Sequence, residues 1–97
     1  MTTVQTRSLA AAVEDAAKLL ATAPEKAERA AWTILRAAPN DPRATLILAS
    51  ARRRLGDADA ARVLLEPLAR AHPRAARPVY ELGLARTATG NAAGGTV

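Results

Sequence analysis

The stretch Ala51–Pro73, "ARRRLGDADAARVLLEPLARAHP", carries the strongest signals for the fold of this chain. Three arginines precede a Gly-Asp pair, and an alanine- and leucine-rich run then ends at His72-Pro73. Gly56 suits the left-handed conformation that ends a helix, and Asp57 is a residue type that caps the next helix. The stretch therefore predicts the end of one helix, a tight turn and a complete second helix.

The signals in this stretch recur along the chain at a spacing of 34 residues. Pro39 and Pro73 are separated by that distance, and each follows an apolar pattern with helical spacing. A fixed offset at which small residues meet small residues is typical of helical repeats. Further pairs at this offset are Ala27 with Ala61, Leu48 with Leu82, Gly56 with Gly90, and Asp57 with Asn91.

The middle repeat predicts two helices on either side of the Gly-Asp turn. Asp41 can cap the first helix and Pro42 can occupy its first position. Pro67 lies within the second helix, where it predicts a bend near 63–64 rather than a break. The residues that recur at helical spacing in the first helix are Leu46, Leu48, Ala49, Arg52 and Leu55. The expected apolar stripe of the second helix is Ala61, Leu64, Leu65 and Leu68.

The flanking segments predict one weaker pair of helices and one single helix. Before the middle repeat, a helix is expected over about 8–21, and "TAPE" makes a turn that places Pro24 at the start of a second helix. That second helix should bury Ala27, Ala31, Ile34 and Leu35. After the middle repeat, the sequence predicts one helix from Pro78 to about Gly90. No further helix is expected to pack on it, so Val79, Leu82 and Leu84 should be partly exposed to solvent.

The predicted fold is all-α, an array of antiparallel helix pairs with about five helices. The repeat domain covers 8–90, as units 8–41 and 42–75 and a partial unit 76–90, with a loose N-terminus at 1–7 and a flexible tail at 91–97.

Composition narrows the function classes. The 97 residues carry a net charge of +5, no cysteine and a single histidine, His72. Disulfides, thiolate metal sites and a histidine metal cluster are therefore excluded, and no catalytic residue or cofactor is expected. No apolar run approaches the roughly 20 residues of a membrane span, and the first residues do not resemble a signal peptide, so we expect a cytoplasmic protein.

The middle repeat resembles the tetratricopeptide repeat family. The large and small apolar pair Leu48-Ala49, the turn Gly56-Asp57, Ala61, Leu65 and the closing Pro73 match the positions of that family. Thr45 and Arg52 depart from it, because the family usually has aromatic residues there. The resemblance implies a scaffold for protein–protein contact whose concave surface is lined by the first helix of each unit.

On that resemblance, ten residues are expected to line a partner-binding groove with an apolar floor and arginine edges. A peptide or protein partner with acidic flanks would suit this groove, since guanidinium groups pair with carboxylates. The family's capture of a C-terminal carboxylate is not expected, because Ile47 and Glu81 stand where it uses asparagine. The expected groove residues are Arg43, Leu46, Ile47, Ser50, Arg53, Arg54, Arg77, Tyr80, Glu81 and Leu84.

Three alternatives remain open at this stage. Residues 51–85 also resemble the repeats that precede the catalytic domain of some bacterial sulfotransferases, which would make this chain an accessory segment without its enzyme. The chain could instead form a homodimer through its last helix, on which no further helix is expected to pack. Nucleic-acid binding is not favoured, because successive helical residues point about 100° apart and Arg52, Arg53 and Arg54 cannot all face one duplex. Arg52 should turn toward the helix pair, while Arg53 and Arg54 lean toward the groove.

Overall fold

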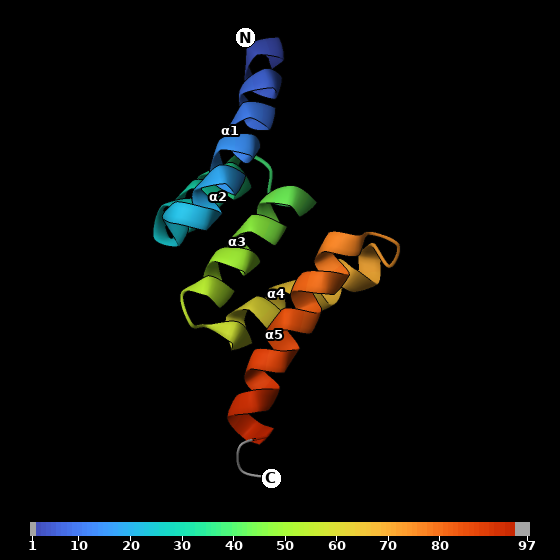
Figure 1. The fold of residues 1–97 in the computed structure, drawn as a ribbon. Coiled ribbons are helices and arrows are strands. Elements are labelled where there is room, and N and C mark those ends of the chain that lie inside the picture. The colour runs from blue at the N-terminus through green and yellow to red at the C-terminus, as the bar shows by residue number, and fades with distance from the viewer. Residues whose placement is uncertain (1, 95–97) are drawn as a thin grey trace.

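A computed structural model describes the backbone of residues 2–94 and the side chains of residues 9–89. Over this part of the chain there are five α-helices and no strand, so the prediction of an all-α fold is confirmed (Figure 1). The helices are α1 (Thr2–Thr22), α2 (Pro24–Ala37), α3 (Pro42–Arg54), α4 (Ala58–Ala71) and α5 (Ala76–Gly94).

The helices pack in chain order and form an elongated array. Each helix contacts the next one, and α3 also contacts both α1 and α5. The molecule measures 56 × 28 × 19 Å, and Figure 1 shows the two termini at opposite ends with α3 between them. Connections of one to four residues between packed helices require antiparallel neighbours, as stacked helix pairs do.

Short polar residues and one glycine set the helix ends, as the sequence predicts. The Asp41 side chain accepts hydrogen bonds from two backbone N–H groups of α3, and Pro42 occupies the first helical position. Gly56 has φ of 94°, which is the left-handed conformation. Asp57 then caps α4 by accepting a hydrogen bond of 3.1 Å from the N–H of Ala60.

The core consists of two clusters that meet at α3. Many core positions are alanines with no exposed surface, which lets neighbouring helices approach closely. α3 supplies Ile47 and Leu48 to the first cluster and Ala49 to the second, so it ties the two helix pairs together. The buried residues of the first cluster are Val13, Ala16, Ala27, Ala31, Ile34, Ala44, Ile47, Leu48 and Ala51. Those of the second are Ala49, Ala61, Leu65, Leu68, Leu82 and Ala85.

Two details of the predicted core are wrong. Leu55 is 42% exposed, because α3 ends at Arg54 and the next residue leaves the helical stripe as it enters the turn. Leu82 was expected to be partly bare but is only 8% exposed, since it packs into the cluster formed by α3, α4 and α5. Val79 is 47% exposed, as predicted.

The terminal helices are longer than their sequence signals suggested. α1 begins at Thr2 rather than near Ser8, and α5 continues past Gly90 to Gly94. Neither glycine nor proline interrupts the chain before α1 ends, and a single glycine costs a helix only about 1 kcal/mol relative to alanine. The predicted loose ends include residues 1 and 95–97, which lie outside the described residues.

Pro67 lies within α4, and the helix continues through it without a break.

Candidate functional site: a concave pocket between the first helices

A concave pocket of about 260 Å³ lies between α1, α3 and α5, the first helices of the three predicted units. Five of the expected groove residues line it: Arg43, Leu46, Ile47, Ser50 and Arg77. The remaining lining residues, Val13, Ala17 and Leu20 of α1, were absent from the expected groove. The helical spacing of apolar residues over 8–21 was the sequence signal that could have placed them there.

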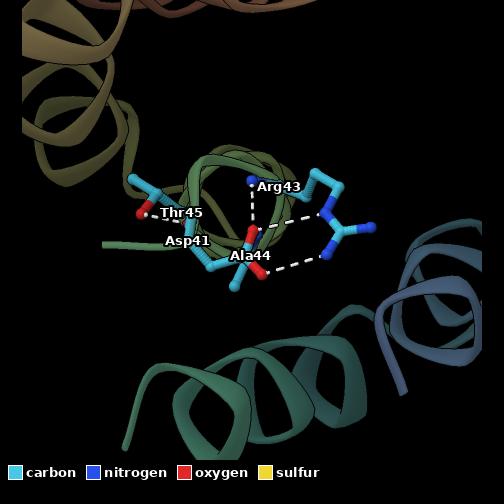
Figure 2. Close-up of polar contacts among 4 residues, drawn as sticks. All are labelled: Asp41, Arg43, Ala44 and Thr45. Atoms are coloured by element: carbon cyan, nitrogen blue, oxygen red, sulfur yellow. Dashed lines mark hydrogen bonds and ion pairs between the residues drawn. The ribbon is translucent and has the colours of Figure 1, made fainter. Parts of the chain in front are cut away.

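Arg43 stands at the pocket with its guanidinium held by Asp41. The Nε atom of Arg43 donates to Oδ1 of Asp41 at 3.4 Å, and its Nη2 atom donates to Oδ2 at 3.2 Å. The same Oδ1 accepts from the backbone N–H of Arg43 at 2.9 Å, so one carboxylate caps α3 and orients the side chain (Figure 2). In Figure 2 the third guanidinium nitrogen points away from Asp41. Within residues 9–89 this nitrogen has no hydrogen-bond partner, so it can donate to another group.

The charge of Asp41 is stabilised at this position. Burial raises the pKa of its carboxyl group, but the contacts that lower the pKa outweigh burial when they are taken together. The side-chain and backbone hydrogen bonds from Arg43, the positive charge of Arg43 and the N–H of Ala44 bring the pKa below its ordinary value of 3.8. The carboxylate thus remains ionised under ordinary conditions, and the orientation of Arg43 is maintained.

The floor of the pocket is apolar, with one polar group. Ile47 and Val13 are buried core residues whose surfaces form part of the wall. Ser50 is only 2% exposed and also lines the pocket. Within residues 9–89, no hydrogen bond involves its hydroxyl, and no fully buried side-chain N or O atom lacks a partner. The Ser50 hydroxyl therefore opens into the pocket.

Arg77 enters the pocket from the first turn of α5. The residue is exposed, and among the described side chains no carboxylate lies within 4.0 Å of its guanidinium. The first turn of α5 also contains no acidic residue. Because the N-terminal end of a helix is itself positive, Arg77 adds a second positive charge where the field already favours an anion.

Arg53 and Glu81, both expected in the groove, form an ion pair inside the molecule. Nε of Arg53 donates to Oε1 of Glu81 at 3.0 Å and joins α3 to α5. The Glu81 side chain is 2% exposed and that of Arg53 is 21% exposed. The expectation that Glu81 offers an exposed groove contact is therefore corrected, because its carboxylate is buried against Arg53.

The other two arginines of the triple cluster do not contact Glu81 within ion-pair distance. Nε of Arg52 lies 2.7 Å from Oε2 of Glu28 on α2, and its Nη1 lies 3.8 Å from Asp57 in the turn before α4. The prediction that Arg52 turns toward the neighbouring helices is confirmed, because its guanidinium lies beside α2 and the start of α4. Arg54 is exposed. Adjacent arginines thus bind carboxylates on opposite neighbours, α2 and α5, and do not form one basic patch.

The remaining aromatic and apolar candidates lie outside the pocket lining. Tyr80 is largely exposed and Leu84 is half-buried on α5. Whether these side chains contact a partner stays a prediction.

Neither a metal centre nor a membrane span is present in the part of the chain that the structure describes. No group of three or more His, Asp or Glu side chains there is placed to hold a metal ion. None of the described helices has both the length and the apolar character needed to cross a membrane. His72 is exposed in the connection between α4 and α5.

No protein-family model matches this chain, and neither the curated proteins nor the solved structures give a match. The resemblances to tetratricopeptide repeats and to sulfotransferase-associated repeats therefore stay predictions.

Proposed function

We propose that this protein is a non-catalytic interaction module of tetratricopeptide type that binds a peptide or helix of a partner protein. The observation that carries the proposal is the pocket itself. Three helices from successive predicted units contribute to one concave surface, with apolar walls and an arginine at each of two helix starts. A surface built in this way suits an elongated partner that runs across several units.

The size of the pocket favours a side chain over a free small molecule. Sites for drug-sized ligands usually enclose about 300–1,000 Å³ and bury most of the ligand. The pocket here has about 260 Å³ and is partly open to solvent. It therefore suits one large side chain that anchors a longer segment, with the rest of the segment on the surface around it.

The distribution of the polar groups supports binding over catalysis. A nucleophile needs a base placed within hydrogen-bonding distance, and the pocket lining offers a hydroxyl and two guanidinium groups but no base. The guanidinium groups of Arg43 and Arg77 remain charged at all ordinary pH values. They can orient an anionic partner but cannot accept a proton from Ser50.

The test is affinity capture from the source organism with the full chain as bait, followed by mass spectrometry. The Arg77→Glu variant should lose the specific partner while its far-UV circular dichroism spectrum is unchanged. Arg36→Glu is the matched control, because it makes the same charge change on an exposed arginine of α2, outside the pocket lining and outside the expected groove. Equal capture by the wild type and both variants would place the interface away from the pocket.

A further inference from the structure

We propose, on the basis of the function proposed above, that the pocket recognises a specific pair of neighbouring partner residues. One is a large apolar side chain, which enters between α1 and α3. The other is an Asp or Glu within about one helical turn of it, whose carboxylate binds Arg43 and Arg77. The occupant is thus an acidic amphipathic segment of another protein.

The apolar half of this recognition follows from the walls of the pocket. Five of its eight lining residues are apolar, and they come from both α1 and α3. Leu46 and Leu20 are only half-buried in the free protein, so a partner side chain can remove further apolar surface from water. This accounts for a large aliphatic or aromatic anchor but gives no preference among acidic, basic and neutral partners.

The acidic half follows from the two arginines. Asp41 occupies Nε and Nη2 of Arg43, and Figure 2 shows the remaining nitrogen directed away from that carboxylate. A side chain held in this way loses little conformational freedom when it binds a second carboxylate. Arg77 lines the same pocket and has no carboxylate partner among residues 9–89, so the pocket carries more positive than negative charge.

The hydroxyl of Ser50 is a further observation that points to a ligand. Ser50 is almost fully buried as a residue, and its hydroxyl has no hydrogen bond to any described residue. Since no fully buried side-chain N or O atom among the described residues lacks a partner, this hydroxyl is accessible from the pocket. A partner carboxylate or backbone group at the mouth of the pocket would supply that bond.

The charges at the helix ends agree with this assignment. The outer helices α2 and α4 have Glu25 and Asp59 in their first turns, where acidic residues are stabilising. The first turns of α3 and α5 contain no acidic residue, and an arginine stands in each. At α3 the cap residue Asp41 offsets the charge of Arg43, but Arg77 makes α5 less stable as an isolated helix. Such local conflicts are expected where residues serve binding.

The test is a selection from a displayed library of random peptides of about 16 residues, long enough for roughly four helical turns. The peptides are fused at their C-termini, so that no free terminal carboxylate is present. The full-length wild-type chain should enrich sequences with a large apolar residue and a nearby Asp or Glu. The selected peptides should bind Arg77→Glu about tenfold more weakly or worse. They should bind Arg36→Glu as well as the wild type, because Arg36 lies on α2 outside the pocket lining.

A second selection makes the charge requirement explicit. Arg77→Glu used as bait should enrich Lys or Arg in place of the acidic residue, next to the same apolar anchor. Enriched peptides that shift the amide resonances of Leu46 and Ser50 but show no acidic preference would overturn this inference while leaving the proposed function intact. If no selected peptide shifts those resonances, the inference and the proposed function both fail.

A second copy of the chain is the competing occupant. Sedimentation equilibrium of the wild type should show a monomer over the concentrations used for selection. A dimer that Arg77→Glu dissociates would overturn the inference, because the pocket would then be filled by this chain itself.

Discussion

Replacing Arg53 with methionine is expected to destabilise the fold more than any other single change in the triple-arginine cluster. The substitution leaves Glu81 without its cation while the carboxylate remains 2% exposed. Breaking a fully buried pair by removing one partner costs about 3–5 kcal/mol. Because the Arg53 side chain is 21% exposed, we expect the low end, about 3 kcal/mol. For a domain of this size, that corresponds to a decrease in Tm of about 12–24 °C.

The two neighbouring arginines are matched controls on the same helix. Arg52 also forms an ion pair, but its side chain is 38% exposed and that of Glu28 is 18% exposed, so Arg52→Met should cost at most about 1 kcal/mol. Arg54 is exposed, and Arg54→Met should change the free energy of unfolding by less than about 0.5 kcal/mol. The measurement is urea denaturation followed by far-UV circular dichroism, with the slope m compared across the series.

A double substitution separates the ion pair from general loss of packing. Arg53→Met combined with Glu81→Leu removes both charges and should recover most of the loss, since apolar residues can replace a buried pair at little cost. If Arg53→Met costs no more than Arg54→Met, the buried pair contributes nothing to stability. If the double variant is less stable than Arg53→Met alone, the loss does not come from an unpaired Glu81.

Two further predictions concern the turns that begin and end the helices. Gly56→Ala should cost about 1–2 kcal/mol in unfolding experiments, because φ is 94° although a Cβ atom would meet nothing within 4 Å. Gly83→Ala lies inside α5 with equal space around it and should instead gain about 0.5–1 kcal/mol. Asp41→Ala should cost about 1–2 kcal/mol at neutral pH. Because the pKa of Asp41 is lowered in the folded state, this difference should persist above pH 3.8 and shrink as the pH falls through the lower folded pKa, in denaturation series at several pH values.

The local features of this fold were accessible from the sequence because their chemistry is local. Asp41, Gly56 and Asp57 act on backbone groups within a few residues, and the resulting turns fix where α3 and α4 begin. The 34-residue offset also predicts how the helices follow one another in the array, because small residues at equivalent positions of each unit are expected to pack in equivalent places. The burial of Leu48 and Ala61 follows from the same periodicity.

The site was less accessible because it depends on how the helices are placed against one another. Arg53 and Glu81 are 28 residues apart, and only the position of α5 against α3 brings them into contact. The resemblance to tetratricopeptide repeats placed both among the expected groove residues. The contribution of Val13 and Ala17 was missed for a similar reason. The helical spacing over 8–21 places them on one face of α1, but only the packing of α1 beside α3 shows that this face borders the pocket.

The positive charge of this chain is divided by position along the helices. In the last turn of α3, Arg52 and Arg53 lie where cations are favoured by the helix dipole, and both have carboxylate partners on neighbouring helices. Arg43 and Arg77 lie in first turns, where the dipole disfavours them, and both line the pocket. The first pair of arginines is accounted for by the stability of the array. In the second pair, Arg43 is held by Asp41 at the start of its own helix, whereas Arg77 has no carboxylate partner among residues 9–89. The anionic partner proposed above would make the position of Arg77 favourable.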